Sequence, residues 1–193
     1  STLLRLTPTL LLNKQSCPGP SPADAIADIL ATLTFNEVFG IEAYPFQHVV
    51  LKHFRSMLPS SADCRPVFLC QPSGGGKSAV RDAFAACQPG VTLNIAPPLL
   101  SLNADQSTKL NLRRVTDKVV PIHWDQYRQA ADLAALEADI ISASSTVSIV
   151  LFSSPQLITD NPARLTLLKK LVAKGQLNCV CIDEAHLVVE FPP

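Results

Sequence analysis

The sequence predicts an α/β fold built around a parallel β-sheet, and three observations lead to this prediction. Short runs of apolar, often branched residues alternate along the chain with stretches whose apolar residues recur at helical spacing. The runs are apolar throughout, which is typical of strands buried on both faces of a parallel sheet. The chain has 193 residues, of which 47% are hydrophobic, so it suffices for one compact lobe but not for two sizeable domains.

The expected helices follow from capping signals and from apolar periodicity. A Pro, Gly and Ser linker at 16–22 precedes the first helix, which Ser21 caps and in which Ile26, Ile29, Leu30 and Leu33 form one face. Each later helix has a similar apolar face, such as Val49, Val50, Phe54 and Met57 in the second. The helices are expected at Ser21–Leu33, Phe46–Met57, Ala79–Cys87, Leu102–Arg113, Gln126–Ile141 and Pro162–Lys174.

The expected strands are the apolar runs between these helices. Each is short, rich in branched residues and bounded by turn-forming or helical segments. Because strands and helices alternate, the strands are expected to be parallel, and ligands of such sheets bind beyond the carboxyl ends of the strands. The strands are expected at Cys64–Cys70, Val91–Ala96, Val119–Ile122, Val147–Phe152 and Asn178–Asp183.

Charge and cysteine content narrow the classes of function. Sixteen basic and sixteen acidic residues cancel, so a nucleic-acid surface, if present, must be local. None of the six cysteines forms a CxxC pair or a zinc-type spacing with histidine, which favours reduced, buried thiols in an intracellular protein. Cys179 and Cys181 share one face of a strand, where core packing competes with a metal or redox pair. No apolar run is long enough to span a bilayer, so no membrane association is expected.

The segment QPSGGGKS at 71–78 predicts a phosphate-binding loop. Three consecutive glycines between a strand and a helix let several backbone N–H groups converge on one anion at the positive end of the helix dipole. Lys77 would then reach the β and γ phosphates, and the Ser78 hydroxyl would bind Mg²⁺. Gln71 stands where the general pattern has its first glycine, and a plain Gly-rich turn before a helix is the alternative.

A second segment, CIDEAHL at 181–187, places Asp183 and Glu184 at the carboxyl end of an apolar strand. In a parallel sheet this end lies at the same edge as a loop that leads from a strand into a helix. There Asp183 can hold Mg²⁺ and Glu184 can polarise a water for attack on the γ-phosphate. The alternative is that the acidic pair only caps a helix beginning at Ala185.

Four segments between Phe39 and Phe191 share their order with one family. PSGGGKS at 72–78 is close to P-T-G-G-G-K-S, and IAPPLLSLNADQ at 95–106 is similar to S-P-L-x-S-L-x-x-D-Q. FSSPQLI at 152–158 is similar to the segment A-P-E-R-L, and IDEAH at 182–186 matches motif II. The chain thus resembles the first RecA-like, ATP-binding lobe of superfamily-two DNA helicases of the RecQ type. Such a lobe has three layers, and this chain is expected to be incomplete at the C-terminus.

The resemblance implies ATP and Mg²⁺ as cofactors, single-stranded or forked DNA as a partner, and an intracellular location, in the nucleus if the source is eukaryotic. It implies catalytic roles for Lys77, Glu184 and His186, with His186 coupling hydrolysis to DNA, and metal binding by Ser78 and Asp183. Residues near the single strand, for which loop capping is the competing explanation, would be Pro97, Leu99, Ser101, Leu102, Ser154 and Pro155. Residues at the nucleotide would be Gln47, Ser73, Gly74, Gly75, Gly76, Lys77 and Ser78.

Gln47 belongs to FGIEAYPFQ at 39–47, which resembles the family's adenine motif F-G-x-x-x-F-R-x-x-Q. The segment is one residue short, and Ile41 stands where the family has an aromatic residue that stacks on the base. A surface glutamine at a helix start is the alternative for Gln47. The expected organisation is an extension and linker at 1–22, a helical lead-in with the adenine-type segment at 23–50, and a partial RecA-like domain at 51–193.

The function expected from the resemblance is the ATP-binding lobe of a 3′–5′ DNA helicase. After DEAH the family reads C-x-S-Q-W, where this chain reads LVVEF at 187–191. The second RecA-like lobe and its arginine finger are expected to be absent, and an arginine finger contributes roughly 10³ to 10⁵ in rate. The chain alone is therefore expected to bind nucleotide, to hydrolyse it slowly and not to unwind DNA. The alternatives are a P-loop kinase or NTPase that is not a motor, and a degenerate helicase-like module that binds nucleic acid.

Overall fold

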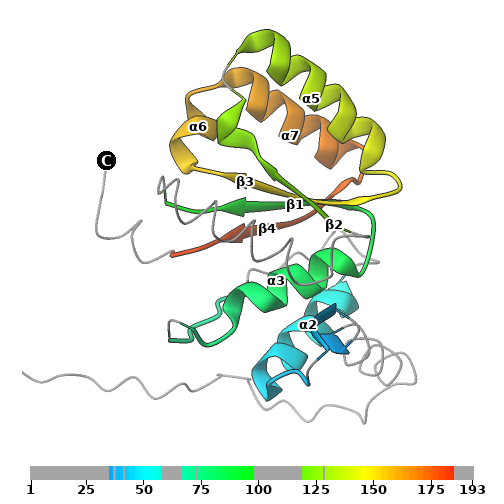
Figure 1. The fold of residues 1–193 in the computed structure, drawn as a ribbon, viewed down its shortest axis with the longest axis vertical. Helices are drawn as coiled ribbons and strands as arrows, with labels where there is room; N and C mark the ends of the chain where they lie inside the picture. The colour runs from blue at the N-terminus through cyan, green and yellow to red at the C-terminus, as the bar shows by residue number, and fades with distance from the viewer. Residues whose placement is uncertain are drawn as a thin grey trace, which may run out of the picture.

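In the computed structural model, the chain forms a four-stranded sheet between two layers of helices (Figure 1). The strands are β1 (Gly90–Ile95), β2 (Val119–His123), β3 (Ser148–Ser153) and β4 (Leu177–Ile182). They lie in the order β2-β3-β1-β4, and every pair is parallel, which confirms the predicted α/β fold. The structure describes residues 35–36, 38–40, 42–57, 67–72, 74–97, 119–127 and 129–184.

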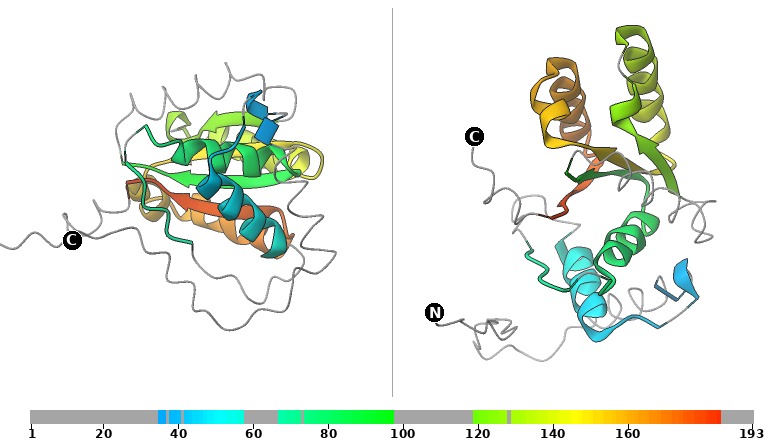
Figure 2. Two further views of the ribbon diagram at one scale, coloured as in Figure 1. Left: turned by 90° about the horizontal axis from the view of Figure 1, so that it is seen from below. Right: turned by 60° about the vertical axis from the view of Figure 1, so that its left-hand side comes forward.

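Helices cover both faces of the sheet, as Figures 1 and 2 show. One face carries α5 (Ala130–Ala143), the short α6 (Pro155–Thr159) and α7 (Pro162–Ala173). The other face carries α3 (Lys77–Ala86), against which α2 (Pro45–Met57) packs. The central strands β1 and β3 are therefore buried on both sides, which favours apolar residues in them, although β1 also buries Thr92 and Asn94.

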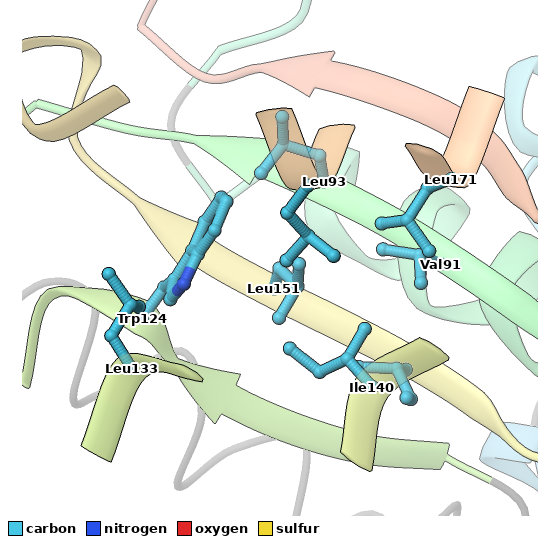
Figure 3. Close-up of a cluster of buried hydrophobic side chains, with 9 residues drawn as sticks. Val91, Leu93, Trp124, Leu133, Ile140, Leu151 and Leu171 are labelled. Atoms are coloured by element: carbon cyan, nitrogen blue, oxygen red, sulfur yellow. The ribbon is translucent and has the colours of Figure 1, made fainter. Parts of the chain in front are cut away.

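The larger core lies between the sheet and the helices α5 and α7 (Figure 3). Its largest member is Trp124, which is 0% exposed. Because its side chain is fully buried, Trp124 belongs to the core and does not form a surface that stacks on bases. The other buried members of this cluster are Val91, Leu93, Leu133, Ile140, Ile149, Leu151, Leu167 and Leu171.

A second cluster joins α2 to α3, and it fixes the helix that carries the Gly-rich turn. It consists of Phe35, Leu51, Val80, Ala83 and Phe84, all buried, with Phe54 stacked at a tilt on Phe84 at a ring-centroid distance of 5.1 Å. Burying such side chains stabilises each by about 1.5–3 kcal/mol relative to leaving them in water. The α2 segment is thus part of the lobe and not a separate arm.

Two expectations about secondary structure and one about burial are corrected. Residues 67–70, part of the strand expected at Cys64–Cys70, pair with none of the four strands, and Phe68 is 85% exposed. Helix α5 begins at Ala130 and not near Gln126, because residues 124–126 form a 3₁₀ turn, named η2. Cys70 is exposed although burial was expected. The helices expected at Ser21–Leu33 and Leu102–Arg113 lie outside the described residues.

Within the described ranges, no helix has the length and apolar character needed to cross a membrane.

Glu137 on α5 gives a prediction about pH. Its Oε1 is buried and has no hydrogen-bond partner among the described residues. Burial raises the pKa of Glu137 above its ordinary value of 4.5, and the nearby charges of Lys170 and Arg164 offset this only in part. A raised pKa means that the folded state binds the proton more tightly than the unfolded chain does. The stability that the protonated form provides is therefore present below pH 4.5 and is lost as pH rises through the folded-state pKa.

We therefore expect Glu137→Gln to unfold at a higher urea concentration than the wild type at neutral pH, because the amide needs no proton. The gap should close toward about pH 4, where Glu137 itself becomes protonated. Asp139→Asn, at an exposed position of the same helix, is the matched control and should leave the midpoint unchanged. A midpoint for Glu137→Gln equal to or below that of the wild type at neutral pH would contradict this prediction.

Candidate nucleotide-binding site

The Gly-rich turn adopts a backbone that side chains would obstruct. Gly74 and Gly76 have φ angles of 77° and 84°, in the left-handed region that favours glycine. A Cβ on Gly75 would lie 3.0 Å from the carbonyl oxygen of Pro72, and one on Gly76 would lie 2.5 Å from Gln47 Nε2. Each of the three glycines is therefore required by the shape of the turn. Gly76 is the N-cap of α3, so the turn leads directly into the helix start.

Lys77 and Ser78 begin α3 and are both half-buried. The Lys77 ammonium donates to the carbonyl oxygens of Gln71 at 2.8 Å and Pro72 at 3.2 Å. The cation is therefore held over the turn by neutral acceptors, which a phosphate oxygen would replace with a stronger, charge-assisted bond. Ser73 lies outside the described residues.

Gln47 on α2 is tied to the turn, and it is 2% exposed. Its Nε2 donates to the Gly76 carbonyl at 3.0 Å, and its Oε1 accepts from the Tyr44 backbone N–H at 2.8 Å. The alternative of a surface glutamine is therefore wrong. The bonds link α2 to the loop that precedes α3, so the adenine-type segment and the Gly-rich turn form one unit.

Tyr44 is an aromatic residue beside this unit that the sequence analysis did not single out. Its side chain is 60% exposed, and its ring stacks on Phe46 at a centroid distance of 6.2 Å and an angle of 12°. The ring lies close to the turn, since a Cβ on Gly76 would be 3.9 Å from Tyr44 Cδ2. An aromatic residue three positions before Gln47 was the available signal. Ile41, which stands at the family's aromatic position, lies outside the described residues.

Asp183 and Glu184 directly follow β4. The Asp183 N–H donates to the carbonyl of Ile95 at the end of β1 at 2.8 Å, so the acidic pair lies level with the end of the central strand. Glu184 is the described non-glycine residue with a φ in the left-handed region, at 52°, and its N–H donates to Asp183 Oδ1 at 3.0 Å. Non-glycine residues rarely adopt this backbone, and strained positions of this kind cluster at functional sites. His186 lies outside the described residues.

The start of α3 and the end of β4 open on the same rim of the sheet. Helix α3 runs antiparallel to the strands, because Arg81 in its middle donates to Asn94 near the end of β1 at 2.9 Å, and Ala85 near its end accepts from Ser148 at the start of β3. Lys77 therefore lies toward the carboxyl ends of the strands, where Asp183 also lies. Figures 1 and 2 both show the start of α3 and the end of β4 toward the same edge of the sheet.

Of the residues expected near DNA, the structure places three. Pro97 follows β1 and is half-buried, and Pro155 is exposed at the start of α6. Ser154 is only 2% exposed and its N–H donates to Asp125, so its hydroxyl is not at the surface as its expected role requires. Leu99, Ser101 and Leu102 lie outside the described residues.

A buried ion pair between Asp125 and Arg164 lies next to Ser153 and Ser154. The sequence analysis did not predict this pair. Asp125 accepts from the Ser153 hydroxyl at 2.8 Å and from the Ser154 N–H at 3.1 Å. Arg164, 1% exposed, lies 3.5 Å from Asp125 Oδ1 and stacks over Trp124 at 5.1 Å. Residues from η2, β3 and α7 are thereby joined at the carboxyl rim of the sheet. Asp125 and Arg164 are far apart in the sequence, so no local sequence pattern predicts that they pair.

Two side chains with oxygen donors lie toward this rim of the sheet. Ser78 supplies a hydroxyl and Asp183 a carboxylate, and Mg²⁺ usually takes one or two protein ligands of this type, with phosphates and waters completing its shell. Within the described ranges, no cluster of three or more His, Cys, Asp or Glu residues is arranged to hold a metal by itself.

The Gly-rich turn at a helix start and the acidic pair beyond β4 are the features of a P-loop α/β lobe. Sequence comparisons show which P-loop proteins this chain is similar to. The chain is 31% identical over 160 residues to the ATP-dependent DNA helicase hus2/rqh1 of Schizosaccharomyces pombe, a match that covers 79% of this chain and 11% of that protein. The chain is therefore related to the RecQ-type DNA helicases, which confirms the resemblance seen in its motifs.

Further relatives support this relationship. The chain is 26% identical over 122 residues to the rat ATP-dependent DNA helicase Q1, with 63% of this chain and 19% of that protein covered. It is 27% identical over 158 residues to the RecQ-like DNA helicase BLM of Xenopus laevis, with 81% and 11% covered. No protein-family model matches the chain. The chain spans 11% to 19% of the length of these relatives.

Proposed function

We propose that this chain is the ATP-binding lobe of an ATP-dependent 3′–5′ DNA helicase. The observation that carries the proposal is that the turn before Lys77 and the acidic pair at Asp183 share one rim of a parallel sheet. The related proteins named above are ATP-dependent DNA helicases. In this proposal the lobe binds ATP with Mg²⁺, and it acts together with a second RecA-like lobe on single-stranded or forked DNA.

The phosphates bind at the start of α3 in this proposal. Backbone N–H groups of the Gly-rich turn and of the first helical turn point at the phosphates, where the helix dipole is positive. The Lys77 ammonium leaves the carbonyl oxygens of Gln71 and Pro72 for the β and γ phosphates. This exchange replaces neutral acceptors with charged ones, and it is the main source of affinity for the triphosphate.

The reaction centre is built from Ser78, Asp183 and Glu184. The Ser78 hydroxyl and the Asp183 carboxylate hold Mg²⁺, which neutralises charge on the β and γ phosphates as the bond to the γ-phosphate breaks. Glu184 orients a water in line with that bond and accepts its proton. In this proposal the two carboxylates serve different partners, and Glu184 has a left-handed backbone directly after Asp183.

The adenine base is read by Gln47 and Tyr44 in this proposal. A glutamine amide has two N–H donors and two acceptor lone pairs. Gln47 uses one donor on Gly76 and one lone pair on Tyr44, so one of each remains. That remaining pair matches the N6 donor and N7 acceptor of adenine. The exposed ring of Tyr44 can stack on the base in place of the aromatic residue that the family carries at the position of Ile41.

The proposal is tested by measuring single-strand binding in the presence and absence of nucleotide. We expect the purified chain to bind a fluorescent single-stranded oligonucleotide, and a non-hydrolysable ATP analogue with Mg²⁺ to change that affinity by at least about fivefold. The oligonucleotide must change nucleotide affinity by the same factor, because coupling between two sites is reciprocal. Nucleotide binding without single-strand binding would favour a P-loop kinase and overturn the helicase assignment. Single-strand binding without nucleotide binding would favour a degenerate module.

A further inference from the structure

Two thiols meet on β4, beneath the helix that starts at Lys77. The Sγ atoms of Cys179 and Cys181 lie 3.7 Å apart, which is van der Waals contact. The two residues are two apart on one strand, so both face α3, and Cys179 packs against the cluster that contains Phe84. Both cysteines are half-buried and neither is in a disulfide.

The side chains of β1 next to Cys179 and Cys181 are polar, and two of their hydrogen-bond donors have no partner among the described residues. In the parallel register, Thr92 of β1 lies opposite Cys179 and Asn94 lies opposite Cys181, on the same face of the sheet. Thr92 Oγ1 and Asn94 Nδ2 are buried donors without a hydrogen-bond partner among the described residues, and both residues are 1% exposed. A buried donor without a partner costs about 1–3 kcal/mol. A sulfur atom that gains negative charge beside them would provide the missing acceptor.

We propose that Cys179 and Cys181 form a redox-active dithiol that closes to an intramolecular disulfide when it meets a peroxide. The contact between the sulfur atoms and the unpaired donors beside them carry the proposal. A disulfide has a bond length of about 2.05 Å, so the two sulfur atoms must approach each other from contact and the strand between them must shift. On its outer side β4 has no partner strand among the described residues, and Cys179 and Cys181 are half-buried, so each keeps part of its surface exposed at this edge of the sheet.

The oxidation balances with a peroxide as the oxidant. The Cys179 thiolate attacks a peroxide oxygen, the O–O bond breaks, and Cys179 becomes a sulfenic acid as the first water leaves. The Cys181 sulfur then attacks the sulfenic sulfur, the S–S bond forms, and the hydroxyl leaves with a proton as the second water. Two thiols lose two hydrogens and two electrons, and hydrogen peroxide is reduced to two waters. Cys179 reacts first, because the hydrogen bond from Cys181 lowers the pKa of Cys179.

The disulfide would strain the strand that carries it. Residues two apart on an extended strand span about 6.6 Å, near the upper limit of about 6.8 Å for the Cα atoms of a disulfide. Closing the bond therefore shortens β4 just before Asp183. Strained disulfides are easily reduced, so the modification is expected to be reversible.

The test measures the redox state of both thiols in the wild-type chain. The folded protein is treated with hydrogen peroxide, denatured, alkylated and digested with trypsin, which cuts after Lys174 and yields Gly175–Pro193 with both cysteines and no others. We expect this peptide to take up no alkyl group, to be lighter than its reduced form by two hydrogens, and to recover both thiols with dithiothreitol. The proposal would be overturned if this peptide took up two alkyl groups at a peroxide concentration that oxidises the exposed Cys70.

Matched variants separate this pair from ordinary thiol oxidation. Cys181→Ser removes the second thiol, so Cys179 should stop at the sulfenic acid, which dimedone traps. Cys70→Ser should leave the peptide disulfide unchanged, because Cys70 is a separate exposed thiol. A disulfide from Cys179 to any other cysteine, or oxygen added to both cysteines without a bond between them, would also overturn the proposal. The wild-type measurement decides the matter even if a variant folds poorly.

Discussion

Replacing Lys77 with alanine is expected to weaken binding of ATP with Mg²⁺ to this chain by about a hundredfold. The Lys77 ammonium lies over the Gly-rich turn, where it bonds the carbonyl oxygens of Gln71 and Pro72. A hydrogen bond to a charged group contributes about 1.5–3 kcal/mol, and each 1.4 kcal/mol is about tenfold in affinity. Loss of the contacts between the Lys77 ammonium and two phosphates therefore weakens ATP binding by about a hundredfold. Isothermal titration calorimetry measures it directly.

Lys169→Ala is the matched control. Lys169 is exposed on α7, across the sheet from the turn, so its removal changes the net charge equally without touching the proposed site. Its ATP affinity should equal that of the wild type. If Lys77→Ala retained wild-type affinity while circular dichroism showed both variants folded, the phosphates would bind elsewhere and the proposed site would be wrong.

The sequence predicted the elements whose identity depends on local composition. Strands β1 and β3 were recognised because both of their faces are buried, so apolar residues occupy most of β3 and, in β1, the positions Val91, Leu93 and Ile95. The helix expected at Ala79–Cys87 was recognised from its apolar face. It is observed as α3 directly after Gly76, whose left-handed φ favours glycine. Helix α7 begins at Pro162, where proline favours a first turn, close to the expected start.

The elements that were missed depend on distant residues. Residues 67–70 have the composition of a strand, but a strand also needs a neighbour with free N–H and C=O groups, and composition does not reveal one. Helix α5 starts late because Asp125 is held in η2 by Ser153 and Ser154, which are far away in sequence. Sequence resemblance singled out Gln47, but its bond to Gly76 could be seen only in the structure.

Replacing Arg164 with methionine is expected to lower the free energy of unfolding by about 3–5 kcal/mol, the usual cost of removing one partner of a buried ion pair. The Arg164 guanidinium donates to the carbonyl oxygens of Trp124 and Tyr127, both at 2.9 Å, and lies 3.5 Å from Asp125. Methionine fills much of the space but donates no hydrogen bond. The variant would leave a buried carboxylate without its cation and two carbonyls without a partner. Urea unfolding followed by circular dichroism measures the change.

The size of this effect depends on the charge of Asp125, which a double variant can test. Asp125→Asn in the Arg164→Met background removes the unpaired charge while the Asn amide oxygen can still accept from Ser153 and Ser154. The double variant should therefore be more stable than Arg164→Met alone, because the uncompensated charge accounts for most of the cost.

Lys169→Met on the same helix is exposed and should change the free energy of unfolding by less than about 0.5 kcal/mol. A loss below about 1 kcal/mol for Arg164→Met would mean that solvent reaches the pair when the partner is removed, and that the ion pair does not hold the rim together.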